Sequence, residues 1–260
     1  MTKTRRDAIK ALLQTKPYVS YEELGEMFPD VSEMTLRRDI DLFERDGSVI
    51  KVRGGARSAK FITTAKDHSM SARMNENTDA KTAIAREAAS FLDVGRSIFL
   101  DSGSTVLQMC EFVPPERFTF TVTNPSLALK LCEKSSLCAV NIVGGRLDRD
   151  YQSVSGLQAM RYLADVNIDI AFLSPSGLSA RSGFTGGNYA ECELKKYVAG
   201  KAATVIMLMD SSKIERSLPY TFCNLDCVDI FITDKPLPGE LAAQAADAGV
   251  RIICTENRQS

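Results

Sequence analysis

From about residue 79 onward, short apolar segments alternate with segments of helical length, and this alternation restricts the fold more than any other feature of the 260-residue chain. Near-continuous apolar strands separated by helices indicate a parallel sheet covered by helices on both faces. We therefore expect an α/β domain with a mostly parallel sheet. The expected strands are residues 97–100, 118–123, 139–143, 168–173, 204–209, 228–233 and 251–254. The expected helices are one that carries Ile84, Ala88 and Phe91, then residues 104–112, 126–133, 157–164, 188–200 and 239–248.

Polar residues or glycines follow several of these expected strands directly. Open α/β sheets bind ligands just outside the carboxyl ends of their strands, where the strand order reverses. A single polar residue at a strand end is also an ordinary loop starter, so the inference depends on the coincidence of several. We expect a small-molecule site among Asp101, Asn124, Gly144-Gly145, Asp210 and Asp234.

The sharpest of these segments is Asp101-Ser102-Gly103-Ser104-Thr105, between an expected strand and an expected helix. Glycine permits close backbone approach, while hydroxyls and helix-start amides can donate to an anion. The segment is neither a Walker A loop nor a G-x-G-x-x-G fingerprint. An ordinary capped turn would have the same sequence, and the loop alone does not separate the two interpretations.

Cations also follow expected strands. Lys213 lies three residues after Asp210, and Lys195 and Arg146 are further candidates for charge neutralisation. An anion site beside hydroxyl-rich loops suggests a phosphorylated sugar or polyol as the ligand, with the anion better supported than the sugar.

The first fifty residues predict three helices. Apolar residues recur at helical spacing over residues 4–14, and Ser20 with Glu23 forms a capping box that begins a second helix. This helix ends at Pro29. A third helix begins at Ser32 and ends at Gly47, with a core stripe of Leu36, Ile40 and Phe43.

A basic hairpin follows the third helix, because Ile50 and Val52 alternate with Lys51 and Arg53 before two glycines. Three helices and a basic hairpin are typical of a winged helix-turn-helix that binds duplex DNA. The arginines of the third helix could instead only pair with Glu33 and Asp41 on a solvated surface; the basic hairpin favours the DNA interpretation. The expected DNA contacts are Ser32, Met34, Thr35, Arg37, Arg38, Lys51 and Arg53.

Composition restricts the class of protein further. The net charge of −1 argues mildly against a nucleic-acid binder, although the position of charge matters more than its total. Seven cysteines without a C-x-x-C pair and a single histidine, His68, favour free thiols and no metal or cofactor. Without an apolar leader or an apolar run of about 18 residues, we expect a cytoplasmic protein. The expected domains are residues 1–57 and 79–260, joined by a linker over 58–78.

With these residues in view, the chain resembles the DeoR family of bacterial transcriptional regulators over nearly its whole length. The amino-terminal match is Val31-Ser32-x-x-Thr35-x-Arg37-Arg38-Asp39 with Gly54-Gly55-Ala56. The carboxy-terminal match comprises Asp101-Ser102-Gly103-Ser104-Thr105, Val122-Thr123-Asn124, Gly144-Gly145, Gly183, Glu193, Lys195, Asp210-Ser211-Ser212-Lys213 and Ile232-Thr233-Asp234.

The resemblance implies a winged helix-turn-helix that reads operator DNA, and a sensor domain similar in fold to ribose-5-phosphate isomerase and the coenzyme A transferases. Family members typically repress sugar-catabolic operons and release DNA when a phosphorylated sugar binds. The sequence departs from the family at Ser104, where threonine is usual, at Ser174-Pro175-Ser176 and at Phe28-Pro29-Asp30. By motif position the implied effector contacts are Asp101, Ser102, Gly103, Ser104, Thr105, Asn124, Gly145 and Lys213, with Lys195 as a further candidate.

Three functions remain open at this point. The first is a repressor of a carbohydrate-catabolism operon that a phosphorylated sugar releases from DNA. The second is an isomerase-like enzyme with a DNA-binding domain, and the third is a constitutive DNA binder whose larger domain only oligomerises. A homo-oligomer, dimer or tetramer, is expected because one helix and one wing cover too few base pairs. The carboxylates that could serve the enzyme as a base are Asp101, Glu191, Glu193 and Asp210.

Overall fold

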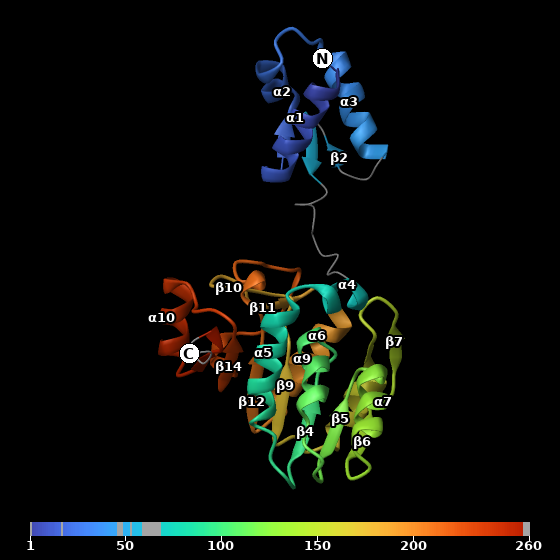
Figure 1. Cartoon of the computed structure of the whole chain (residues 1–260), viewed down its shortest axis with the longest axis vertical. Helices are drawn as coiled ribbons and strands as arrows, with labels where there is room; N and C mark the ends of the chain where they lie inside the picture. The colour runs from blue at the N-terminus through green and yellow to red at the C-terminus, as the bar shows by residue number, and fades with distance from the viewer. Residues whose placement is uncertain (1, 17, 46–48, 53, 59–68, 257–260) are drawn as a thin grey trace. The chain divides into compact units, whose positions relative to one another are not determined.

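The computed structural model describes residues 2–16, 18–45, 49–52, 54–58 and 69–256. The chain divides into two compact units, Met1–Lys66 and Asp67–Ser260. Each unit has a hydrophobic core of its own, and many elements of both are labelled in Figure 1.

The smaller unit has three helices and a three-stranded antiparallel sheet of order β1-β3-β2. Leu36, Ile40 and Phe43 are buried in its core, as the predicted stripe requires. Strand β1 was not predicted. The elements are α1 (Thr2–Thr15), β1 (Tyr18–Ser20), α2 (Tyr21–Met27), α3 (Glu33–Arg45), β2 (Val49–Val52) and β3 (Gly55–Ser58).

The caps of these helices differ in part from the expected ones. Ser20 Oγ accepts a hydrogen bond from the Glu23 amide at 3.0 Å, as a capping box requires. The Glu23 carboxylate, however, pairs with Lys16. Helix α3 ends at Arg45, and its predicted stop, Gly47, lies outside the described residues.

The larger unit contains a seven-stranded parallel sheet of order β15-β14-β12-β9-β4-β5-β6. Every predicted strand is present, which confirms the fold class. The chain runs from β4 outward to β6 and then returns to the other side of β4, so the strand order reverses between β4 and β9. The strands are β4 (Ser97–Leu100), β5 (Thr119–Val122), β6 (Ala139–Ile142), β9 (Ile170–Leu173), β12 (Thr204–Leu208), β14 (Ile230–Thr233) and β15 (Arg251–Cys254).

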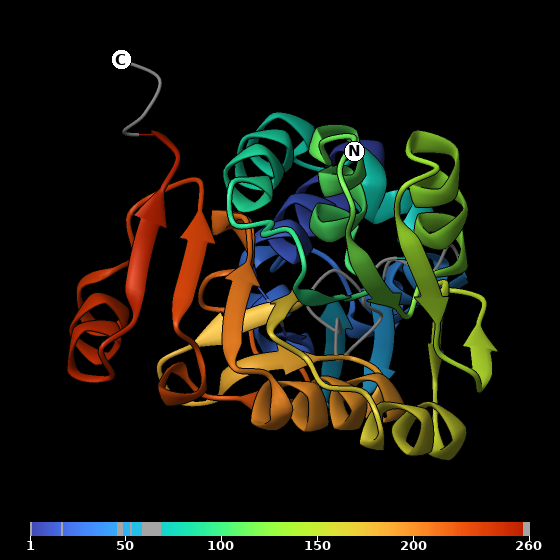
Figure 2. The same ribbon diagram turned by 90° about the horizontal axis from the view of Figure 1, so that it is seen from below.

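Helices cover both faces of this sheet (Figure 2). Alternate strand residues point to opposite faces, so Phe99 packs in one core, while its neighbours Ile98 and Leu100 pack in the other. Helices α4 (Met70–Asn75), α5 (Thr78–Ala89), α6 (Ser104–Met109) and α7 (Pro125–Lys134) lie on one face, and α8 (Leu157–Ala164), α9 (Tyr189–Lys201) and α10 (Gly239–Asp247) on the other.

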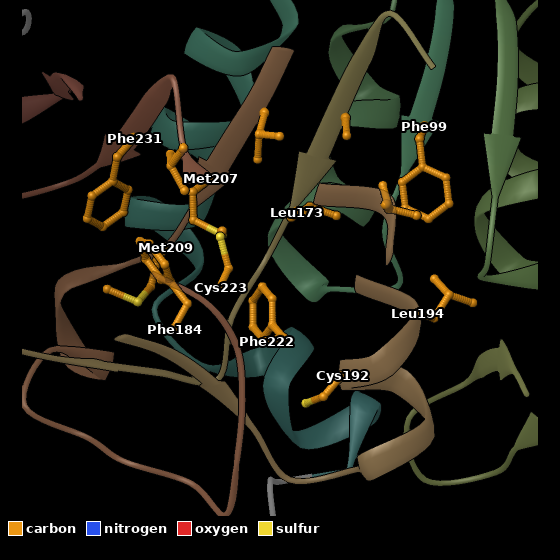
Figure 3. Packing of buried hydrophobic residues seen from close by; sticks show 14 of the residues in the cluster. Phe99, Leu173, Phe184, Cys192, Leu194, Met207, Met209, Phe222, Cys223 and Phe231 are labelled. Atoms are coloured by element: carbon orange, nitrogen blue, oxygen red, sulfur yellow. The ribbon is translucent and has the colours of Figure 1, made fainter. Parts of the chain in front are cut away.

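Five short strands were not predicted. Strands β7 (Arg146–Asp148) and β8 (Ser153–Ser155) form a hairpin, and β10 (Gly177–Ser179), β11 (Gly183–Gly186) and β13 (Tyr220–Cys223) form an antiparallel sheet. Phe184 of β11 stacks edge-on against Phe231 of β14, with ring centroids 5.5 Å apart, and this contact joins the small sheet to the core (Figure 3). Segments of three or four polar or glycine-rich residues carry too short a period to reveal such strands.

Helix α4 lies within the segment 58–78 that the sequence suggested as a linker. Its Met70 is buried in the larger core, and the Met70 amide donates to the Asp150 carbonyl at 2.7 Å. The last part of that segment is therefore a folded part of the larger unit. His68 lies outside the described residues. In the described part of the chain no helix has the length and apolar character that a membrane span needs.

Candidate functional site

The outer face of α3 exposes most of the residues predicted to contact DNA. Ser32, Met34, Arg37 and Arg38 are exposed, and Met34 retains 61% of its accessible surface. Thr35 is half-buried, and its hydroxyl lies 3.0 Å from that of Ser32. An exposed apolar side chain about one helical turn before two arginines is able to contact base edges.

The two arginines of this face have different partners. The Nε and Nη2 atoms of Arg37 donate to Glu33 Oε1 at 2.8 and 2.6 Å, and its guanidinium lies 4.4 Å from the centre of the Tyr21 ring. The hydrogen bond to Glu33 raises the pKa of Arg37. Arg38 has no ion pair or side-chain hydrogen bond among the described residues. The surface-pairing interpretation thus holds for Arg37 and not for Arg38.

The wing cation Lys51 is tied back to α3. Its Nζ atom lies 2.5 Å from Asp41 Oδ1, and its amide donates to Glu44 Oε1 at 3.0 Å. The hydrogen bond to Asp41 raises the pKa of Lys51. The other predicted wing contact, Arg53, lies outside the described residues.

Asp39 is a buried anion whose role the sequence did not reveal. It is 1% exposed and accepts hydrogen bonds from the Nε atoms of Arg5 and Arg6, both at 2.7 Å. Because Asp39 lies on the apolar stripe of α3, between Leu36 and Ile40, its spacing could have identified it as a buried partner for α1.

In the larger unit, seven charged side chains are buried among the described residues. Direct contacts or electrostatic interactions link each of them to another member. Four are cations and three are carboxylates. We call this group the buried charge cluster: Arg73, Lys81, Asp101, Glu191, Lys195, Asp210 and Lys213.

Lys195 holds the first part of the cluster together at the reversal of the strand order. Its Nζ atom lies 2.9 Å from Asp101 Oδ2, which follows β4, and donates to the Ser174 carbonyl, which follows β9, at 2.7 Å. The Ser174 amide donates to Asp101 Oδ2 at 3.0 Å. Glu191 Oε1 lies 3.7 Å from Lys195 Nζ and accepts a hydrogen bond from Ser102.

Burial and charge move these pKa values in a consistent way. Burial raises the pKa of Glu191, and the nearby Asp101 raises it further, while Lys195 opposes the shift. Burial lowers the pKa of Lys195, but Asp101 and Glu191 outweigh it, so the net pKa of this ammonium is raised. Lys195 is therefore a fixed cation.

Lys213 and Lys81 form the second part of the cluster. Lys213 Nζ donates to the Pro175 carbonyl at 3.0 Å and lies 3.9 Å from Asp210 Oδ2. Lys81 Nζ donates to two carbonyls, those of Arg73 and Glu76. Burial lowers the pKa of Lys81, and Asp210 opposes this shift.

Buried polar atoms without a partner mark the ends of β4 and β5. Ser104 Oγ, Thr105 Oγ1 and Asn124 Nδ2 have no hydrogen bond among the described residues. Asn124 Oδ1, in contrast, caps α7 by accepting from two amides, at 2.8 and 3.1 Å. Nearly all buried polar groups in folded proteins are paired, so these open donors indicate where a ligand would supply oxygen atoms.

Two predicted glycines have structural explanations. A Cβ atom at Gly103 would lie 2.4 Å from Ser174 Cβ, so the close approach made there is to the protein itself. Gly145 is exposed with φ of +141°, and a Cβ atom would lie 2.5 Å from the Ser155 carbonyl oxygen of the β7–β8 hairpin. Arg146, also suggested as a neutralising cation, is exposed on β7.

The structure thus joins Asp101, Ser102 and Lys195 directly and connects Lys213 through the turn at residues 174–176. The sequence did not single out Arg73 or Lys81. Lys81 precedes Ile84, Ala85 and Ala88 at helical spacing, so its place on the buried stripe of α5 was a detectable signal. In the described residues no group of histidine, cysteine or carboxylate side chains could hold a metal ion.

Comparison with known proteins gives two family matches. Residues 5–61 match the DeoR-like helix-turn-helix domain, and residues 76–235 match the DeoR C terminal sensor domain. The chain is 31% identical to the HTH-type transcriptional regulator GlpR of Haloferax volcanii, over 85% of this chain and 86% of that protein. It is 30% identical to IolR of Bacillus subtilis, over 85% and 87%, and 26% identical to a putative aga operon transcriptional repressor of Escherichia coli, over 97% and 93%.

Solved structures with a similar fold are more distant. Ribose 5 phosphate isomerase A from Neisseria gonorrhoeae is 15% identical with a TM-score of 0.37, covering 53% of each chain. A tetrameric eIF2B complex from C. thermophilum is 17% identical with a TM-score of 0.46, covering 66% of this chain and 61% of that chain.

Proposed function

We propose that this chain, which belongs to the DeoR family of transcriptional regulators, represses a carbohydrate-catabolism operon and leaves its operator when a phosphorylated sugar binds. The smaller unit binds DNA through α3 and the β2–β3 wing, and the protein acts in the cytoplasm. Membership of the family rests on both matched domains and on the identity to GlpR.

The observation that carries the proposal is the charge balance of the buried charge cluster. Four buried cations face three carboxylates. Uncompensated buried charge is costly, and a phosphate group would neutralise it. The open donors at Ser104, Thr105 and Asn124 lie at the neighbouring strand ends, where the hydroxyls of a sugar would find partners.

An isomerase function is less well supported, because its base would have to be available to a substrate proton. Asp101 is bonded to Lys195 and to the Ser174 amide, and Glu191 to Ser102. Asp210 accepts from Asn77 Nδ2 at 3.0 Å and also from Ser212. We propose that the protein is not an enzyme. Incubation with aldose and ketose phosphates should give no interconversion.

A constitutive DNA binder would not need these open donors. We propose instead a homo-oligomer, whose two DNA-binding units match two operator half-sites only in the ligand-free state. The ligand shifts this equilibrium by its difference in affinity for the two states. Light scattering at working concentration should report more than one copy.

Fluorescence anisotropy tests the proposal with the full chain and duplex DNA from upstream of its own gene. Affinity should fall as potassium chloride rises, because cations contact the phosphates. One member of a panel of five- and six-carbon sugar phosphates should weaken binding by about five- to 150-fold, the usual range of allosteric coupling. The matching unphosphorylated sugar is the control. The proposal fails if no sugar phosphate alters the affinity.

A further inference from the structure

Arg73 of α4 is a buried cation with open donors. The residue is 7% exposed, and its Nε and Nη2 atoms have no hydrogen-bond partner among the described residues. Its guanidinium lies 5.3 Å from the centre of the ring of Tyr151, in the loop between β7 and β8. A ring face attracts a cation but does not accept the two N–H hydrogen bonds in the plane of the guanidinium.

The two open donors lie on the same edge of the guanidinium group, the edge that binds an oxyanion with two parallel hydrogen bonds. Other arginines of this chain use the same edge on carboxylates: Nε and Nη2 of Arg37 both donate to Glu33, and Nε and Nη2 of Arg5 contact Asp39. The edge of Arg73 is thus the one of these three that is left open.

Arg73 lines a small cavity of about 20 Å³ between α4, α5 and the 3-10 turn at Ser211–Lys213. Lys81 and Lys213 line the same cavity, but their ammonium groups already donate to backbone carbonyls. Asp210 and Arg216 also contribute to the lining. Inside this cavity, the buried donors without partners belong to Arg73.

Arg73 also acts electrostatically on both parts of the buried charge cluster. It lowers the pKa of Glu191, beside Lys195, and it lowers the pKa of Lys81, beside Asp210. An anion held by Arg73 would therefore also act electrostatically on both parts of the cluster.

We infer that Arg73 binds the phosphate of the effector through its Nε–Nη2 edge, and that this contact anchors α4, the first described helix after the connecting segment, to the ligand. The inference rests on the proposed function and extends it. Through this contact the effector would bind directly to α4, the first described helix after the DNA-binding unit in the sequence. Without ligand, α4 is held by contacts such as the hydrogen bond from the Met70 amide to Asp150.

The test compares Arg73→Met with Arg161→Met, which removes an exposed arginine from α8. The probe is inorganic phosphate, titrated into the full chain against sodium chloride of equal ionic strength, and the readout is the unfolding midpoint. Phosphate should raise the midpoint of the wild type and of Arg161→Met, and this rise should be lost in Arg73→Met. Without phosphate, Arg73→Met should unfold at the same or a higher temperature, since it removes an unpaired buried cation.

A lower midpoint of Arg73→Met without phosphate would show a structural role and overturn the inference. So would an undiminished response of this variant, or a wild type that phosphate does not stabilise. The proposed function fails separately: if phosphate stabilises the wild type through Arg73, but no sugar phosphate alters operator affinity, the anion site stands without a regulatory role.

A second arm tests the anchoring of α4 with the sugar phosphate that releases the wild type from DNA. Its dissociation constant should rise by about ten- to a hundredfold in Arg73→Met. At concentrations that saturate the variant, operator release should remain incomplete. Lys213→Met should also weaken binding, but it should release DNA fully at saturation because the contact to α4 remains. Full release of Arg73→Met at saturation would overturn the anchoring of α4.

Discussion

The two units of this protein use charge in opposite ways. In the smaller unit the cations predicted to contact DNA lie on the surface, where Arg37 and Lys51 pair with nearby carboxylates. In the larger unit the buried charge cluster lies inside the fold, and its cations outnumber its carboxylates. Among the described residues of the smaller unit, Asp39 is the buried charged side chain, and two arginines satisfy it.

This difference fits the two ligands that we propose, duplex DNA and a phosphorylated sugar. An exposed ion pair contributes little to stability, so Arg37 can exchange Glu33 for a DNA phosphate at small cost. A buried charge is expensive unless it is paired, so the excess positive charge of the buried charge cluster would favour the anion that we propose as its ligand. The comparison predicts that substitutions of buried charges in the larger unit change stability, while substitutions of exposed cations on α3 change DNA affinity alone.

The largest expected effect is that of Lys195→Met. Lys195 is 4% exposed and neutralises Asp101, so its removal leaves a buried carboxylate without its counter-charge. The free energy of unfolding should fall by about 3–5 kcal/mol. Urea unfolding followed by circular dichroism measures this loss. Lys196→Met is the matched control, because Lys196 is exposed on the same helix, and its effect should stay within about 0.5 kcal/mol.

Equal stabilities of Lys195→Met and Lys196→Met would break the comparison between the units, since buried charge would then carry no more weight than exposed charge. Hydrogen exchange at the amides of the smaller unit measures the stability of that unit separately. If Lys195→Met lowers the free energy of unfolding of the larger unit and leaves that of the smaller unit unchanged, the comparison between the units becomes sharper.

The fold of the larger unit followed from sequence because its central strands are mostly apolar and buried on both faces. Helix α8 occupies residues 157–164 as predicted. The sequence did not predict the β7–β8 hairpin, because strands such as Ser153–Ser155 are polar and three residues long. Helix α4 was not predicted for a similar reason. Its six residues make fewer than two helical turns, which is too short to show a helical period, although Met70 and Arg73 share its buried side.

The candidate site was predictable where a residue follows a strand, as Asp101 and Lys213 do. The sequence did not show that Lys195 would reach Asp101, because that contact depends on how α9 packs under the reversal point between β4 and β9. The sequence predicted Gly103 as a ligand contact, and it did not show that Ser174 packs against this glycine. Buried cations such as Lys81 look like surface residues until the helix face is assigned.

The second effect concerns Glu191→Gln and its dependence on pH. Burial raises the pKa of folded Glu191 above its ordinary value of 4.5. Between these two values the unfolded chain releases the proton while the folded protein keeps it, so the contribution of Glu191 to the free energy of unfolding declines as pH rises. The uncharged Gln lacks this decline.

Glu191→Gln should therefore gain stability relative to wild type as pH rises above about 5, at up to about 1.4 kcal/mol per pH unit, the limit for one proton. Urea unfolding of both proteins from pH 5 to pH 8 measures the difference. Glu193→Gln is the control, because Glu193 is exposed on the same helix, and its difference from wild type should not vary in this way. A constant difference for Glu191→Gln would mean that Lys195 keeps Glu191 ionised in the folded state.

The smallest effect on stability is expected for Arg38→Ala. This variant also gives the strictest test of the comparison between the units. Arg38 is exposed and has no partner among the described residues, so the free energy of unfolding should change by less than about 0.5 kcal/mol. Operator affinity should nevertheless fall by about five- to tenfold, and the slope of log affinity against log salt should decrease by about one if Arg38 contacts a phosphate.

Anisotropy across a potassium chloride series measures both, while calorimetry should give the same affinity for the sugar phosphate as in wild type. An unaltered operator affinity would remove Arg38 from the DNA contacts, and a changed sugar-phosphate affinity would show that the two units do not divide their charges by ligand.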